Sequence, residues 1–136
     1  MTDSPMRSRD KALQSLYEIE INNYIYLNKE IESKPEHGRF CKGLINGVIN
    51  NLEELDHKLI KYLDRPIKAL DIIEKNILRL ATYELIYKRE LDNPIIINEA
   101  IRLAKKYGSV DGYKYINAIL DKMIKAEDLK SYNRQK

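Results

Sequence analysis

Cysteine, tryptophan and long apolar runs are scarce or absent in this sequence of 136 residues. The single cysteine, Cys41, has no second cysteine to pair with, so packing must stabilise the fold and a reducing compartment is the default. No apolar run approaches the roughly 18 residues that a membrane-spanning helix needs. The opening Met1–Pro5 is not followed by the apolar stretch of a secretory signal. We therefore expect a cytoplasmic protein with no membrane partner.

Turn-forming residues are also few. The chain has 5 glycines and 4 prolines, with 43% hydrophobic and 33% charged residues. This balance is typical of a folded, water-soluble chain, and the length is that of one domain. Because no segment alternates apolar and polar residues with a period of two, strands are not expected. The sequence predicts a single all-α domain of six or seven helices over residues 1–136.

Apolar residues at helical spacing locate these helices. The stretch 39–63 is either two helices or one kinked helix, because Asn50–Asn51 weaken it in the middle. Residues 72–89 are apolar around most of the circumference, which is typical of a buried central helix. Gly108 stands where a left-handed C-terminal cap would lie. Four further helices are predicted. The first begins at Ser4–Pro5, the second covers 24–33, the third covers 98–107, and the last runs from a cap at Ser109 or Asp111 to near Glu127.

The sequence offers few residues that could form a catalytic or metal-binding site. Glu54 and His57 have the i, i+3 spacing of carboxylate-bridged metal bundles, but the motif occurs once, and a solvated helix face is the better interpretation. Cys41 lies four residues after His37, yet a lone cysteine beside apolar residues is more often part of a core. Gly47, with Gly43 one turn earlier, allows a neighbouring helix to approach. There is no glycine-rich phosphate loop and no paired cysteine for zinc. The sequence therefore predicts a binding protein rather than an enzyme.

Cationic and aromatic residues suggest what is bound. One face of the first helix carries Arg7, Lys11 and Gln14, with Arg9 and Tyr17 to either side. The last helix carries Lys114 and Asn117 on its polar face and Tyr115 at the edge of its apolar arc. Cations follow phosphates and rings stack on unpaired bases, so single-stranded RNA is one candidate ligand. The alternative is an ordinary charged surface, since the first eleven residues carry a net charge of only +1 from Arg7, Arg9 and Lys11 against Asp3 and Asp10.

Four ordered blocks resemble the bacterial transcription antitermination factor NusB family. They are Arg9-Asp10-Lys11-Ala12-Leu13-Gln14-Ser15-Leu16-Tyr17, Ile77-Leu78-Arg79-Leu80-Ala81-Thr82-Tyr83-Glu84-Leu85, Ile97-Asn98-Glu99-Ala100-Ile101-Arg102-Leu103-Ala104-Lys105-Lys106-Tyr107-Gly108 and Lys114-Tyr115-Ile116-Asn117-Ala118-Ile119-Leu120-Asp121-Lys122. The blocks lie in the family's order and spacing and cover nearly the whole chain. The resemblance implies two three-helix subdomains with a connecting helix.

The resemblance also implies a function without enzymatic chemistry or a cofactor. NusB-like proteins pair with NusE, which is also a small-subunit ribosomal protein, and bind the boxA RNA element. The complex helps RNA polymerase read through terminators, notably in ribosomal RNA operons. The family's protein-facing surface involves the central helix, where Glu74 stands at a contact position. Its RNA contacts, carried over by motif, fall on Arg7, Arg9, Lys11, Gln14, Tyr17, Asp111, Lys114, Tyr115 and Asn117.

This chain departs from the family at two places that concern RNA. The N-terminal arginine run is less dense, and Gly112 stands where serine or threonine is common. A helical protein–protein adaptor that never touches RNA therefore stays open as an alternative. An RNA-modifying enzyme is a third hypothesis, because a NusB-like domain is also found fused to ribosomal RNA methyltransferases. We do not favour it, because these 136 residues leave no room for the cofactor-binding domain of such an enzyme.

Several residues have competing structural roles. We expect Arg79 and Glu84 to form an internal or subunit-contact pair, and Asn98 and Glu99 to open a helix at its positive dipole end. By contrast, Arg7, Arg9 and Lys114 have no evident packing role. RNA contact is therefore the favoured interpretation for these three residues.

Overall fold

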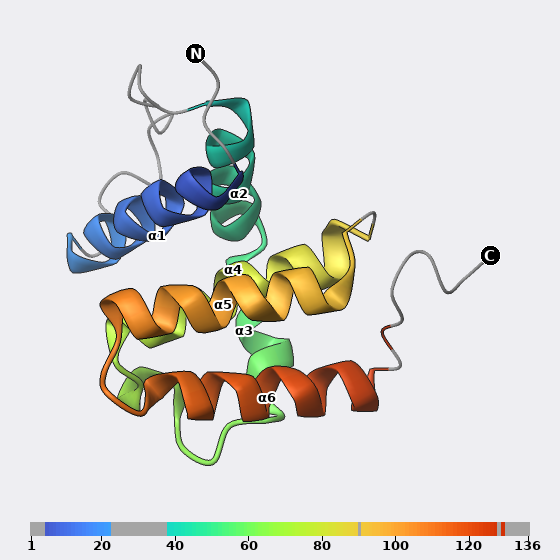
Figure 1. The fold of residues 1–136 in the computed structure, drawn as a ribbon. Coiled ribbons are helices and arrows are strands. Elements are labelled where there is room, and N and C mark those ends of the chain that lie inside the picture. Colours follow the sequence, from blue (N-terminus) through green and yellow to red (C-terminus); the bar gives the residue numbers. More distant parts are fainter. Residues whose placement is uncertain (1–4, 23–37, 90, 128, 130–136) are drawn as a thin grey trace.

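A computed structural model describes residues 5–22, 38–89, 91–127 and 129 as helices joined by short turns, with no strand in any of these ranges (Figure 1). The predicted all-α class is confirmed. The predicted helix over 24–33 and the residues Ser4 and His37 lie outside the described residues. The elements are α1 Pro5–Ile21, α2 Arg39–Asn50, α3 Leu52–Ile60, a 3₁₀ turn η2 Ile67–Ala69, α4 Ile72–Tyr87, α5 Asn93–Tyr107 and α6 Gly112–Ala126.

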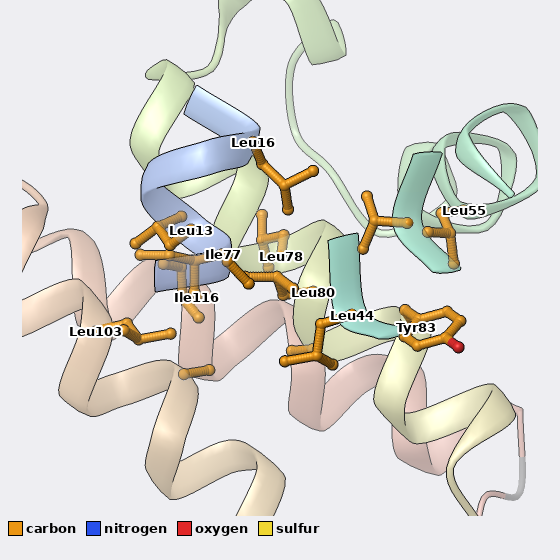
Figure 2. Packing of buried hydrophobic residues seen from close by; sticks show 14 of the residues in the cluster. Leu13, Leu16, Leu44, Leu55, Ile77, Leu78, Leu80, Tyr83, Leu103 and Ile116 are labelled. Carbon is orange, nitrogen blue, oxygen red and sulfur yellow. The ribbon is translucent and has the colours of Figure 1, made fainter. Parts of the chain in front are cut away.

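Helix α4 is the central element, as its apolar circumference predicts. Every residue from Lys75 to Leu85 is buried, and α1, α2, α3, α5 and α6 all pack against this helix. α1 and α2 also pack on each other, as do α5 and α6, so two groups of helices meet at α4. Figure 2 shows the shared core, to which α1 contributes Leu13, α3 contributes Leu55 and α6 contributes Ile116.

The stretch 39–63 contains two helices rather than one kinked helix. Asn51 separates α2 from α3, and its side-chain amide donates to the Gly47 carbonyl oxygen at 2.7 Å. Gly47 admits the ring of Tyr83 from α4, since a Cβ on this residue would lie 2.1 Å from the ring. The close approach predicted for this glycine pair is therefore found at Gly47, while a Cβ on Gly43 would meet no atom of the described residues within 4 Å.

Two predictions about the ends of α5 are wrong. The helix begins at Asn93, so Asn98 and Glu99 lie inside it and do not open it. The physical reason is that Pro94 falls in the first turn, where the missing N–H costs nothing. At the other end, Gly108 is extended, with φ −92° and ψ −172°, rather than left-handed. Glycine is required there for space, since a Cβ would lie 2.8 Å from the Ala104 carbonyl oxygen.

Helix α6 follows a short loop, with Asp111 at its N-cap position. The Asp111 side chain makes no capping hydrogen bond, so it stays on the surface. Along the described parts of the chain, no helix combines the length and apolar character needed to span a membrane.

Candidate nucleic-acid interface

The first-helix residues singled out from the sequence lie on an accessible face of α1. Arg7 and Gln14 are exposed, Lys11 is half-buried and Tyr17 is 37% exposed. Both Arg7 and Lys11 also take part in interactions with other parts of the chain. Four of the five predicted α1 residues therefore stand where a large ligand can reach them.

Arg9, the fifth predicted residue, is buried, and the prediction that it has no packing role is wrong. Its guanidinium donates from Nε and Nη2 to the two Glu84 oxygens at 2.8 and 2.7 Å, and from Nη1 to Glu99 at 3.2 Å. It also lies 5.3 Å from the centroid of the Phe40 ring. Because only 4% of the residue is exposed, we exclude Arg9 from the candidate surface.

The α1 face is fixed to the last two turns of α5 by Asp10. The Asp10 carboxylate accepts from Arg102 at 2.7 Å, from Lys106 at 2.8 Å and from the Tyr107 hydroxyl at 3.1 Å. Burial opposes ionisation of Asp10, but the bonds from Arg102 and Lys106 outweigh it and lower the pKa of this carboxyl. Arg102 in turn donates to Glu99 at 3.0 Å, which joins Asp10 to the Arg9–Glu84 pair.

A second ionic group fixes the other end of α1. The Glu20 carboxylate forms an ion pair with Lys75. It also accepts hydrogen bonds from the Asn76 amide at 3.0 Å and from the Arg79 guanidinium at 2.9 Å. Arg79 also forms a two-bond pair with Asp56 of α3, both bonds at 2.8 Å. The expected Arg79–Glu84 pair is therefore replaced by Arg79 with Glu20 and Asp56, and by Glu84 with Arg9. The reason is that Arg79 faces Glu20 on α1 and Glu84 faces Arg9 on α1. The spacing of residues along α4 does not reveal these partners.

The predicted residues of α6 lie on the surface at the start of that helix. Asp111, Lys114 and Asn117 are exposed, and Lys114 pairs with Asp111 at 3.4 Å. Tyr115 is half-buried; its hydroxyl donates to Asp64 at 3.1 Å, and the Arg65 guanidinium lies 4.7 Å from its ring centroid. The bonds from Arg65 and Tyr115 lower the pKa of Asp64 to about 2.

The last turn of α5 contacts both α1 and the start of α6. Lys106 reaches Asp10 on α1, and the neighbouring Lys105 lies 4.8 Å from the centroid of the Tyr113 ring on α6. Figure 1 shows the end of α5 between α1 and the start of α6. Neither Lys105 nor Lys106 is among the residues predicted to contact RNA, because nothing in the local sequence pattern indicates which helices this turn contacts.

Glu74 positions the loop that leads into α6. Its Oε2 accepts from the Ser109 backbone N–H at 2.9 Å and from the Ser109 hydroxyl at 2.6 Å. A Cβ on Gly112 would lie 2.0 Å from the same oxygen, so glycine and Glu74 fit each other. Glu74 was predicted from the resemblance as a contact for NusE; that role stays a prediction, and the loop anchor is a role that the sequence analysis missed.

These features define the class first: an all-helical domain of two helix groups around a central helix, with cationic and tyrosine side chains on the surface of α1 and α6. The NusB family profile matches residues 6–125. The transcription antitermination protein NusB of Xanthomonas axonopodis pv. citri (strain 306) is 37% identical, over 85% of this chain and 77% of that protein. The chain belongs to the NusB family.

Solved structures agree with this assignment. NusB of T. maritima matches with a TM-score of 0.82 and 30% identity, over 92% of this chain and 93% of that chain. A structure of the antitermination factors NusB and NusE in complex with dsRNA matches with a TM-score of 0.73 and 26% identity, over 89% and 96% of the two chains.

Proposed function

We propose that this chain is a cytoplasmic transcription antitermination factor that binds boxA-type single-stranded RNA together with NusE. The resulting complex supports read-through by RNA polymerase, notably in ribosomal RNA operons. Membership of the NusB family and the name of its curated relatives support this role. A solved relative that was crystallised with NusE and dsRNA supports NusE and RNA as the two kinds of partner.

One observation in this chain carries the RNA-binding part of the proposal. Arg7, Gln14 and Tyr17 on α1 and Lys114 and Asn117 on α6 are exposed, and the lysine-bearing last turn of α5 contacts both of these helices. Cations on such a surface attract phosphates, and tyrosine rings stack on unpaired bases. We propose that RNA contacts come from Arg7, Lys11, Gln14, Tyr17, Asp111, Lys114, Tyr115 and Asn117.

The mechanism is that of an adaptor with no catalytic step, and residues 1–136 act as a single NusB-like helical RNA-binding domain. RNA binds the α1–α6 surface, and NusE binds a surface that involves α4 and Glu74, next to the loop that leads into α6. Each contact alone is weak. Holding both ligands on one rigid body raises the effective concentration of each near the other, so the affinities are coupled.

The test is a titration of labelled boxA-type RNA with this protein, with and without NusE, over a range of salt concentrations. We expect tighter binding with NusE, and a log–log salt slope of about −0.7 for each phosphate neutralised. If no RNA binds in either condition while NusE still binds, the chain is a protein–protein adaptor. A salt-independent RNA affinity also contradicts the proposal.

A further inference from the structure

One tyrosine on the surface between α5 and α6 lies against two lysines. The ammonium of Lys105 is 4.8 Å and that of Lys114 is 6.0 Å from the centroid of the Tyr113 ring. The ring is half-buried, so one part packs on the core while the rest stays accessible.

Lys105 differs from its neighbours in its electrostatic partners. Lys106 pairs with Asp10 and Lys114 pairs with Asp111. Lys105 is exposed and has no carboxylate partner among the residues that the structure describes. The partial negative charge at the end of α5 favours a cation in the last turn, and Lys106 already supplies one there. Of Lys105, Lys106 and Lys114, Lys105 is therefore the one whose charge no carboxylate of the described residues competes for.

Lys105 and Tyr113 lie where α5 meets α6. The last turn of α5 contacts α1 through the ion pair of Lys106 with Asp10, and it contacts α6 through Lys105 and the Tyr113 ring. This turn therefore offers an RNA strand a path from α1 to α6. The loop between α5 and α6 is held in place by Glu74, which accepts two hydrogen bonds from Ser109.

We propose that Lys105 and Tyr113 form an additional nucleotide subsite, which binds one phosphate and one unpaired base of the RNA as it crosses from α1 to α6. This inference rests on the proposed function and extends it to residues that the resemblance does not identify. In the complex a base stacks on the Tyr113 ring, and the flexible Lys105 side chain moves its ammonium from the ring to the adjacent phosphate. Lys114 does the same on the α6 side.

The experiment measures binding of boxA-type RNA in the presence of NusE by fluorescence anisotropy at several salt concentrations. Lys105→Gln removes the cation and keeps a long side chain. Tyr113→Leu removes the ring and keeps apolar packing, while Tyr113→Phe keeps the ring. Lys122→Gln is the matched control, since Lys122 is an exposed lysine farther along α6. Melting temperatures of all variants are measured alongside.

We expect Lys105→Gln to make the log–log salt slope shallower by about 0.7, the loss of one phosphate contact. Tyr113→Leu weakens binding roughly tenfold without changing the slope, and Tyr113→Phe restores it. Lys122→Gln binds like wild type. Should Tyr113→Leu fail to fold, the slope of Lys105→Gln decides alone.

Three results overturn the subsite. In the first, Lys105→Gln and Tyr113→Leu bind like wild type while an Arg7→Ala, Lys114→Ala double variant is weakened; the proposed function then stands and only the subsite is lost. In the second, the two variants lose affinity only as far as they lose thermal stability, which makes both residues structural. In the third, wild type binds no RNA at all, and the proposed function fails with the subsite.

Discussion

Two arginines near the start of α1 have opposite roles because of their positions around the helix. At 100° per residue, Arg7 and Arg9 point about 200° apart. Arg9 enters the interface with α4 and α5 and forms a two-bond pair with Glu84, whereas Arg7 stays exposed. Removing one partner of a buried ion pair leaves an uncompensated charge, which is far costlier than removing a surface charge.

We therefore predict that Arg9→Ala lowers the free energy of unfolding by about 3 kcal/mol or more. Arg7→Ala, the matched control, changes it by less than about 0.5 kcal/mol. Urea denaturation followed by circular dichroism measures both variants. Equal effects of the two substitutions would show that the Arg9–Glu84 pair does not stabilise the fold.

Gly112 and Glu74 provide a second residue-scale prediction. A methyl group at position 112 would lie 2.0 Å from Glu74 Oε2, so Gly112→Ala forces the carboxylate away from Ser109. Overpacking of this kind costs about 1–3 kcal/mol. In a Glu74→Ala background the space is free, and Gly112→Ala costs less. A double-mutant cycle measures the coupling, and additive effects would contradict the proposed fit between the two residues.

At the scale of the element, α1 is held on the rest of the fold by ionic groups at both ends. Asp10 binds three side chains of α5, and Glu20 binds three side chains of α4. Burial disfavours ionisation of Glu20, but Lys75 and Asn76 bind its charged form and lower its pKa. The pKa of Asp10 is lowered in the same way by Arg102 and Lys106.

These lowered pKa values predict an acid-sensitive fold. Because the folded state holds Asp10 and Glu20 below their ordinary values of 3.8 and 4.5, their stabilisation is present above those values and is lost as the pH falls below them. Urea midpoints should therefore decline from about pH 5 downward. Asp10→Asn should be less stable at neutral pH and show a flatter decline. Glu53→Gln, which removes an exposed carboxylate, should follow wild type.

The same element shows what the sequence can predict. Helical spacing predicts that Ala12, Leu16 and Ile19 share one face of α1, and these residues are 0%, 2% and 7% exposed. It also identified α4 as the central helix. It could not assign Arg9 to the interior, because a charge enters a core only where opposite charges on distant elements receive it. Glu84 and Glu99 are 75 and 90 residues away along the chain.

At the scale of the whole molecule, the candidate site is assembled from helices that are far apart in sequence. The family motif identified residues on α1 and α6, but the last turn of α5 between them became visible only in three dimensions. The extended conformation of Gly108 and the anchor at Glu74 position the loop after this turn. Such loop geometry depends on space and tertiary contacts, and these leave no local pattern in the sequence.

A double variant tests whether this surface acts as a unit. Arg7→Ala with Lys114→Ala removes one cation from each side of the surface. We expect weaker RNA binding and a salt slope shallower by about 1.4, while the melting temperature stays nearly unchanged. A drop in stability that matches the loss of affinity would assign both residues to the fold rather than to RNA.

The most direct test of the adaptor mechanism is a closed binding cycle with this protein, boxA-type RNA and NusE. RNA affinity is measured with and without saturating NusE, and NusE affinity with and without saturating RNA. The adaptor mechanism predicts that each ligand tightens the other, and by the same factor, as linkage requires. If RNA affinity is identical in the presence and absence of NusE, the two sites are not coupled and the adaptor mechanism is wrong.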